Sequence, residues 1–333
     1  MDYSHLIPLI DKFTGLRILV VGDVILDEYL TGRAERLSRE APIPVLEFER
    51  CDLIPGGAAN PTVNLAALGA AAIQIGVVGD DANAGQLSNL LAKRGIETAG
   101  LVRDPDRPTT TKTRLMAQMG LRFPQQIARL DRINRQPISG PIEHAINGQI
   151  KRWATGVSAI MVSDYGSGLL TDAVIDTIRD LRRDGPLLIT ADAQGEIDKY
   201  GAFDLVKCNV DEAMRFLGRP LRHDSDFEES SDLLLSRLHL RGAILITRGA
   251  EGITLIKRDK DVAHIPAIRV EDVYDTVGAG DTVLAAVTLA LAAGASVEDA
   301  ATLANIAAGI VIRKVGNYAP SPDELKAAVR AYS

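Results

Sequence analysis

Short apolar runs alternate with longer segments of helical period along most of the chain. Runs rich in β-branched and other apolar residues predict buried strands at residues 16–21, 73–78, 159–162, 187–190, 205–208 and 243–247. Helices are predicted at residues 84–94, 142–153 and 172–183, and further helices after residues 280, 296 and 321. Strands alternating with helices predict an α/β fold, a doubly wound and mostly parallel sheet flanked by helices.

Two segments interrupt this rhythm. In residues 31–49, Pro42 and Pro44 lie within an extended, partly alternating pattern that suits edge strands. In residues 109–131, strand-forming residues alternate with basic ones. We therefore expect a single domain over residues 1–333, with these two segments inserted as a small projecting β lid. Because an exposed apolar face on the lid needs a cover, we also expect a homodimer formed through the lid.

Composition and charge narrow the possible partners. The chain of 333 residues has a formal net charge of −7, which disfavours binding to nucleic acid or to an anionic membrane surface. Cys51 and Cys208 show no metal-binding or redox spacing, and they indicate free thiols in a reducing compartment. The longest uncharged run, residues 282–297, is shorter than the ~20 apolar residues of a membrane span. With no secretory signal evident, a cytoplasmic protein is expected.

A glycine turn near residue 280 is the first candidate for chemistry. Gly278, Ala279 and Gly280 precede Asp281 and a long apolar run that predicts a buried helix. Glycine allows close backbone approach, and free N–H groups at a helix N-terminus bind anions. A carboxylate beside a phosphate site is what phosphoryl transfer to a hydroxyl requires. The alternative is an ordinary turn in which Asp281 only offsets the helix dipole.

Other polar groups stand at the ends of predicted strands or at a second glycine turn. Ligand sites of parallel α/β sheets lie at such strand ends, although each group could also be a simple turn, cap or loop residue. The candidates are Asp23, Gly57, Asn60, Asp192, the pair Asn209 and Glu212, and the run Thr247-Arg248-Gly249. Neither a P-loop motif nor a dinucleotide-binding glycine motif occurs, which argues against those two classes of enzyme.

The combination of these motifs resembles one family. Residues 275–282 resemble the C-terminal signature of the ribokinase-like (PfkB-type) carbohydrate kinases, and residues 56–60 resemble their N-terminal glycine signature. Within that family, residues 34–45, 129–131 and 163–168 are similar to bacterial heptose-7-phosphate kinases. Gln194 stands where a lysine is expected in that group. The chain also ends soon after the kinase signature, so the resemblance implies a stand-alone kinase rather than a bifunctional one.

The resemblance implies ATP-dependent phosphorylation of the anomeric hydroxyl of D-glycero-β-D-manno-heptose 7-phosphate to the 1,7-bisphosphate, in ADP-heptose and lipopolysaccharide core synthesis. It implies Asp281 as the catalytic base, with Gly278, Ala279 and Gly280 holding the transferring phosphoryl group. The implied ATP-binding residues are Asn209, Glu212, Thr247, Arg248, Gly249, Gly278, Gly280 and Asn305. Mg²⁺ would be held by Glu212 through water, and a monovalent cation such as K⁺ would lie near the backbone of Asp275 and Val277.

For the sugar, the resemblance implies contacts from Asp23, Gly57, Asn60, Asp192 and Asp281. The phosphate of the substrate needs cations, and the lid offers Lys112, Arg114 and Arg129, with Arg33 and Arg36 behind them. Other readings remain open. The chain could phosphorylate another sugar or sugar phosphate, or bind sugar without catalysis, and a reductase is a more distant alternative.

Overall fold

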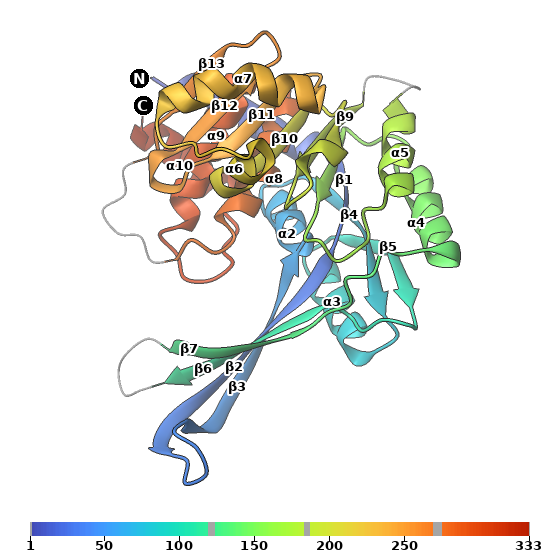
Figure 1. Ribbon diagram of the computed structural model, residues 1–333, viewed down its shortest axis with the longest axis vertical. Coiled ribbons are helices and arrows are strands. Elements are labelled where there is room, and N and C mark those ends of the chain that lie inside the picture. Colours follow the sequence, from blue (N-terminus) through green and yellow to red (C-terminus); the bar gives the residue numbers. More distant parts are fainter. Residues whose placement is uncertain (1, 119–123, 183–186, 269–274, 333) are drawn as a thin grey trace.

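The main body is built on a nine-stranded sheet with the order β13-β12-β11-β10-β9-β8-β1-β4-β5 (Figure 1). The computed structural model describes residues 2–118, 124–182, 187–268 and 275–332. The strands are β1 (Arg17–Gly22), β4 (Ala71–Gly79), β5 (Glu97–Asp104), β8 (Ala159–Ser163), β9 (Leu188–Asp192), β10 (Leu205–Asn209), β11 (Ala243–Thr247), β12 (Ile253–Lys257) and β13 (Val262–Ile265). β12 pairs antiparallel with both β11 and β13, and the other pairs of this sheet among the described residues are parallel. The predicted doubly wound, mostly parallel sheet is confirmed.

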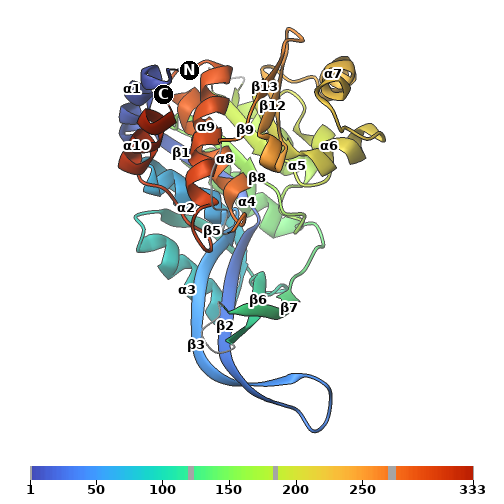
Figure 2. The ribbon, with the colours of Figure 1, turned by 90° about the vertical axis from the view of Figure 1, so that its left-hand side faces the viewer.

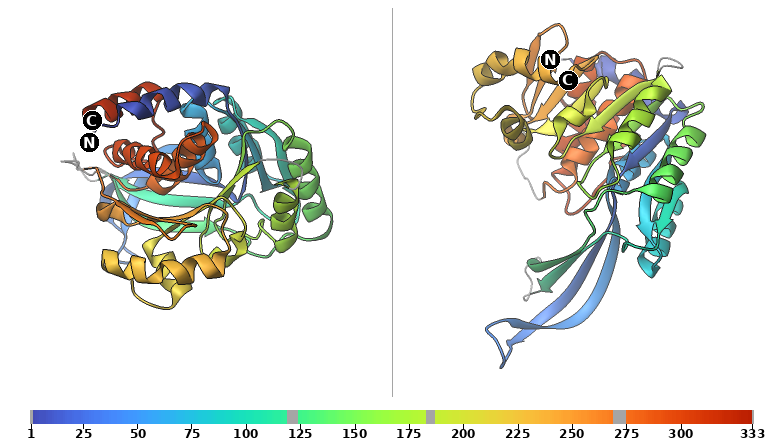
Figure 3. Two further views of the ribbon diagram at one scale, coloured as in Figure 1. Left: turned by 90° about the horizontal axis from the view of Figure 1, so that it is seen from above. Right: turned by 45° about the vertical axis from the view of Figure 1, so that its right-hand side comes forward.

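Helices cover both faces of this sheet (Figure 3). One face carries α1 (Ile7–Asp11), α2 (Ala59–Ala67), α3 (Ala82–Ala92), α8 (Ala279–Ala292), α9 (Val297–Val311) and α10 (Pro322–Tyr332). The other carries α4 (Gly140–Trp153), α5 (Asp172–Leu181), α6 (Val210–Leu217) and α7 (Asp224–Leu238). Single 3-10 turns lie at Ser4–Leu6, Lys12–Gly15, Ile197–Tyr200 and Gly249–Glu251.

The central strand β1 shows why a continuous apolar run marks such a strand. Ile18 and Val20 point into the core on one face, whereas Leu19 and Val21 point into the core on the other. β1 lies between β4 and β8, where the strand order changes direction. Parallel α/β sheets bind ligands beyond the strand ends at such a point.

A second sheet projects from the body as the lid (Figures 1 and 2). Its strands, in the order β3-β2-β6-β7, are β2 (Val24–Leu37), β3 (Pro44–Gly57), β6 (Thr111–Gln118) and β7 (Gln125–Arg132). The sequence places its first segment at residues 31–49, but the strands extend further at both ends. The chain enters β2 one residue after β1 ends, and it leaves β3 at Gly57 directly before α2.

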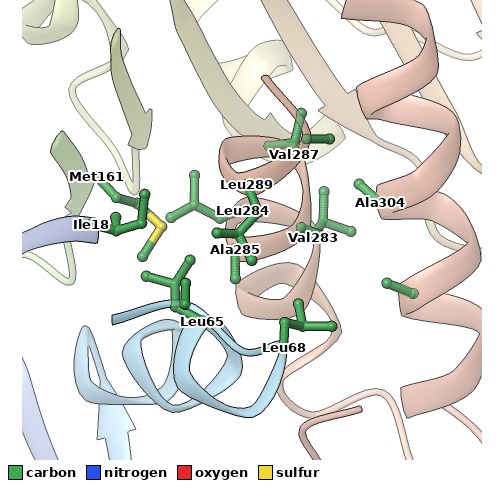
Figure 4. Packing of buried hydrophobic residues seen from close by; sticks show 14 of the residues in the cluster. Ile18, Leu65, Leu68, Met161, Val283, Leu284, Ala285, Val287, Leu289 and Ala304 are labelled. Carbon is green, nitrogen blue, oxygen red and sulfur yellow. The ribbon is translucent and has the colours of Figure 1, made fainter. Parts of the chain in front are cut away.

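Helix α8 explains how the glycine turn near residue 280 is held. The helix is apolar on all sides because it packs between the sheet, α2 and α9 (Figure 4). Leu284 and Val287 are fully buried, as are Leu65 on α2 and Leu68 directly after it. The N-terminus of α8 is thereby fixed beside the strand ends. No helix in the described ranges is both long and apolar enough to cross a membrane.

Candidate active site

Asp281 lies in the first turn of α8, and both of its carboxylate oxygens accept hydrogen bonds. The Nδ2 amide of Asn60 donates to Oδ2 at 2.6 Å, and the hydroxyl of Tyr165 donates to Oδ1 at 2.8 Å. Asn60 belongs to the first turn of α2 and Tyr165 follows β8, so three distant segments meet here. Burial raises the pKa of Asp281 to about 6, although both hydrogen bonds act to lower it. The carboxylate is therefore mostly ionised at neutral pH and can accept a proton.

The turn before Asp281 requires glycine. Gly278 has a φ of +80°, and a Cβ there would lie 3.0 Å from Nδ2 of Asn60. The hydroxyl of Thr282 donates to Oδ1 of Asn64, which ties α8 to α2 a second time. The N–H of Ala279 donates weakly to the carbonyl of Thr276, at 3.3 Å. The turn is thus braced against α2, with the helix N-terminus directed at the strand ends.

Lys207 is a member of this site that the sequence did not single out. Its Nζ lies 2.7 Å from Oδ2 of Asp192, and both side chains are buried. A Cβ on Gly280 would lie only 2.9 Å from the same Nζ, so the ammonium group rests against the glycine turn. Burial opposes the charge of Lys207, but Asp192 holds its pKa above the usual value. Oδ1 of Asp192 is buried without a hydrogen-bond partner among the described residues.

A cavity of about 490 Å³ opens beside the glycine turn. Five residues predicted to meet ATP or its transferring phosphoryl group line it, namely Thr247, Gly249, Ala279, Gly280 and Asn305. Much of the remaining wall is apolar, with Ile253, Ile268 and Val283 among its residues. The amide of Asn305 donates to the carbonyl of Pro266, which fixes one side of the cavity. Its volume and apolar wall suit a small planar ligand.

Asn209 and Glu212, predicted to meet ATP, form a capping box at the start of α6. Oδ1 of Asn209 accepts from the N–H of Glu212 at 2.9 Å, and Oε2 of Glu212 accepts from the N–H of Asn209 at 2.7 Å. The capping alternative is therefore present in the structure, and it leaves the other oxygen of Glu212 for a ligand.

The carboxylate of Glu212 is the group that would meet Mg²⁺ in this site. No group of three or more His, Cys, Asp or Glu side chains within the described ranges is placed to hold a metal. A single carboxylate at Glu212 agrees with an ion held chiefly by water and by nucleotide phosphates. Asp275, proposed beside a monovalent cation, accepts from the N–H groups of Val277 and Gly316.

Arg248, a predicted ATP ligand, directs its side chain elsewhere. Its guanidinium lies over the ring of Phe227 and bonds to Asp224, Glu251 and Thr254. Its neighbours Thr247 and Gly249 line the cavity, but the side chain of Arg248 does not. The structure thus brings the backbone of this loop to the cavity and places the charge in a separate cluster.

Asp23 also has contacts other than those expected. Its carboxylate accepts from the backbone N–H groups of Tyr165 (3.0 Å), Ser167 (2.9 Å) and Leu169 (3.3 Å). Burial raises the pKa of Asp23 to about 6 against the effect of these bonds. A Cβ on Gly57, whose φ is +55°, would lie 2.4 Å from the carbonyl oxygen of Asp23. Asp23 therefore fixes the loop that carries Tyr165, and Gly57 permits the close approach of β3.

The lid cations differ in how near they come to Asp281. Lys112 places Nζ 5.4 Å from the centre of the Tyr165 ring. Arg114 pairs with Asp27 at 2.5 Å, whereas Arg129 forms two bonds to Asp131. Further out, Arg33 pairs with Glu49, and Arg36 is exposed. Of these five, Lys112 is the one in contact with a residue bonded to Asp281. Burial lowers its pKa.

Tyr165 and Lys207 are the two site residues absent from the sequence predictions. Tyr165 lies in the run at residues 163–168, which was noted only for its resemblance to one group of kinases. Lys207 stands two residues before Asn209 at the end of a predicted strand. A lysine within an apolar strand was a signal, since a buried lysine needs a charged partner.

Comparison with known proteins gives consistent matches. The family model described as pfkB family carbohydrate kinase matches residues 16–123 and 156–324. Two curated relatives are bifunctional HldE proteins: 38% identity over 99% of this chain for Trichlorobacter lovleyi, and 40% over 98% for Geobacter metallireducens. The chain spans 66% and 65% of their respective lengths.

Solved structures share the fold. The ribokinase of Arabidopsis thaliana in complex with ribose and ATP aligns with a TM-score of 0.72 at 17% identity, covering 95% of this chain and 99% of that one. The phosphofructokinase-2 of Escherichia coli in complex with potassium aligns with a TM-score of 0.77 at 19% identity, with the same coverage. At these identities the likeness concerns the fold.

Proposed function

Because the chain belongs to the pfkB family of carbohydrate kinases, we propose that it transfers the γ-phosphoryl group of ATP to the anomeric hydroxyl of D-glycero-β-D-manno-heptose 7-phosphate. The observation that carries the proposal is the ionised carboxylate of Asp281, held between α2 and the loop after β8 at the edge of the cavity. The resemblance of residues 34–45 and 163–168 to heptose-7-phosphate kinases supports the choice of sugar.

In this proposal the two substrates lie on opposite sides of Asp281. ATP would occupy the 490 Å³ cavity, with its base against Ile253 and Ile268 and its phosphates at the N-terminus of α8. The sugar would lie on the side of Asn60 and the lid. Asp281 takes the proton of the anomeric hydroxyl as that oxygen bonds to the γ-phosphorus, and ADP leaves with the electrons of the broken bond.

Positive charge around the transferring group comes from the chain itself. The ammonium of Lys207 rests against Gly280, and the N-terminus of α8 would add partial positive charge. Mg²⁺, bound to ATP and reached by Glu212 through water, would neutralise phosphate charge. A monovalent cation beside Asp275 and Val277 remains part of the proposal, and its test is the dependence of turnover on K⁺.

The experiment that tests the function is ADP release against a panel of sugars. Heptose 7-phosphate should give the highest kcat/KM, above unphosphorylated heptose and a ketohexose phosphate. A clear preference for another sugar would contradict the proposed substrate but would agree with the proposed kinase activity. The absence of ADP release with every sugar, together with saturable sugar binding, would instead favour the non-catalytic alternative.

Removing the charge of Lys112 should weaken binding of the sugar phosphate selectively. We expect Lys112→Met to raise KM for the sugar phosphate at least ~10-fold, since a hydrogen bond to a charged group contributes about 1.5–3 kcal/mol. KM for ATP should stay unchanged. Arg129→Met should have a smaller effect, because Arg129 is already paired with Asp131.

The matched control is Arg50→Met, which removes an exposed lid arginine that pairs with Asp52. It should leave both KM values unchanged. Steady-state kinetics with each substrate varied in turn make the measurement. Equal increases in both KM values for Lys112→Met would argue against a role specific to the sugar phosphate.

We also propose that two copies associate through their lids. Among the described residues of the lid, five large apolar side chains are exposed, namely Leu37 (68%), Ile43, Phe48 (70%), Ile127 and Leu130. Exposed apolar groups gathered on one projecting sheet indicate an interface. A second copy would bring the same apolar groups to meet them, as two-fold dimers do.

Introducing charge at this surface should produce monomers. Phe48→Glu is expected to reduce the molar mass measured by light scattering to that of one chain. Val315→Glu is the matched control, because Val315 is exposed to a similar extent (69%) but lies outside the lid. A wild-type protein that is monomeric at all concentrations would contradict the proposal.

A further inference from the structure

Tyr165 contacts both Asp281, the proposed catalytic base, and Lys112 on the lid. Its hydroxyl donates to Oδ1 of Asp281 at 2.8 Å, and its ring lies under Nζ of Lys112 on β6 of the lid. The only other side chain bonded to the Asp281 carboxylate within the described residues is Asn60, which takes the opposite oxygen. Tyr165 therefore determines, together with Asn60, which way this carboxylate faces.

We propose that Tyr165 is the positioning residue of the catalytic base, which keeps the carboxylate of Asp281 ionised and oriented and joins it to the lid. The inference rests on the proposed role of Asp281 as the base. It adds a residue that acts through Asp281 rather than on the substrate, and it explains why the loop after β8 is so firmly held.

The chemistry of a phenol suits this task. Burial, followed by the charge of Asp281, raises the pKa of Tyr165 well above its usual value, so the hydroxyl stays protonated and can only donate to the carboxylate. A hydrogen bond donated to an ionised carboxylate favours the ionised form. Burial of Asp281 acts in the opposite direction. The phenol thus offsets part of the desolvation that would otherwise leave the base protonated.

Other charged groups face the same pair from every side. Asp192 disfavours ionisation of Asp281, and Lys207 favours it. Around Tyr165, Asp27 adds negative charge from β2, whereas the ammonium of Lys112 lies over the ring face. A cation over an aromatic face draws electron density from the ring, which makes the hydroxyl a better donor. The lid is therefore connected to the base through one side chain.

The loop that carries Tyr165 is fixed by buried carboxylates. Asp23 accepts from the N–H groups of Tyr165, Ser167 and Leu169, and Asp164 accepts from the N–H of Gly166. The hydroxyl of Tyr200 in turn donates to Asp164. Tyr200 is therefore a matched comparison, since it also donates a buried hydroxyl to a carboxylate but has no contact with Asp281.

The test compares the pH dependence of kcat/KM for the sugar phosphate in Tyr165→Phe, Tyr200→Phe and the wild type. Losing the phenol raises the pKa of Asp281, so the acid limb of Tyr165→Phe should move up by about one pH unit. At pH 6 this variant should be slower than the wild type by about 5-fold beyond any difference at pH 8.5. Ionisation of the substrate is common to all three proteins and cancels in the comparison.

Tyr200→Phe should keep the wild-type acid limb. If both variants shift alike, Tyr165 acts only by supporting the loop. If neither shifts, the positioning role is wrong. Circular dichroism and thermal unfolding establish that each variant is folded.

A second readout keeps this inference separate from the proposed function. The infrared band of the protonated carboxyl that Asp281→Asn removes can be followed with pH in the absence of substrate. It should titrate at higher pH in Tyr165→Phe than in the wild type. If that shift occurs but no sugar is phosphorylated, the assigned function fails while the link between Tyr165 and Asp281 stands. An unchanged titration overturns the inference even if the kinase activity is confirmed.

Discussion

Asp281→Asn should lower kcat at least ~100-fold and leave ATP binding intact, because a general base typically contributes 10²–10⁴-fold to the rate. The substituted amide has nearly the same shape, so Asn60 and Tyr165 can still bond to it, with Tyr165 now accepting. ATP would lie on the other side of the glycine turn, whose residues do not change. Turnover by ADP release and ATP affinity by calorimetry make the measurement.

The control removes a carboxylate from the first turn of the neighbouring helix. Asp299 is the third residue of α9, and its backbone N–H donates to the hydroxyl of Ser296. Asp299→Asn should leave turnover near that of the wild type. Near wild-type turnover in Asp281→Asn would contradict the assignment of Asp281 as the catalytic base.

The same substitution should also stabilise the protein at neutral pH. The pKa of Asp281 rises from 3.8 in the unfolded chain to about 6 in the folded protein. The folded state therefore binds this proton more tightly, and the contribution of Asp281 to stability falls as pH rises from about 4 to 6. Asparagine does not ionise, so the Asp281→Asn variant does not lose stability in this way as pH rises. The free energy of unfolding at pH 7 should increase by up to ~3 kcal/mol, and the gain should vanish at pH 4.

Lys207→Met should destabilise the fold by ~3–5 kcal/mol, because it leaves the carboxylate of Asp192 buried without its cation. Lys207, in the middle of β10, is in register with Asp192, the last residue of the neighbouring strand β9. Neither side chain can reach water without opening the sheet. Denaturant unfolding at pH 7 measures the change.

The double variant Lys207→Met with Asp192→Asn separates charge from packing. With no charge left in the site, we expect most of the lost stability to return. The double variant should nevertheless be inactive, since the ammonium beside Gly280 is missing. A loss below about 1 kcal/mol in Lys207→Met would mean that Asp192 is not held as an ion by Lys207.

The sequence predicted those features of the fold that depend on residues close together along the chain. The strands β1, β8, β10 and β11 are apolar runs, and each was recognised as a strand. The helices predicted after residues 296 and 321 were also recognised, and the hydroxyls of Ser296 and Ser321 each accept from the N–H three residues later. The strand β5 was missed, because an edge strand with Glu97 and Arg103 among its residues lacks such a run.

Contacts between distant segments explain the remaining differences at the site. Tyr165 and Asp281 are 116 residues apart, and the sequence around either residue gives no sign of the hydrogen bond between them. Arg248 looked available for a phosphate because Asp224, which pairs with it, lies 24 residues away. Asn209 and Glu212, in contrast, are three residues apart, and their capping bonds were foreseen as one alternative.

The irregularities of the lid have a consequence for assembly. The pairing of β2 with β3 shifts register between Thr31 and Gly32 and again between Ala34 and Arg36. The pairing of β6 with β7 shifts between Leu115 and Met116. Thr31 is paired with Met116, so the first shift in β2 and the shift in β6 lie at one level of the lid. The lid sheet is curved along its length (Figure 2). Bulges bend and twist a strand.

This level divides the lid into two parts. The part near the body carries Asp27, Lys112 and Arg114, and the outer part carries Leu37 and Phe48. In the proposed dimer, Leu37 and Phe48 lie beyond this level, whereas Leu130, which pairs with Thr113, lies in the part near the body. Substitutions in the outer part can therefore alter how the two copies of the proposed dimer meet without disturbing the groups proposed to face the sugar.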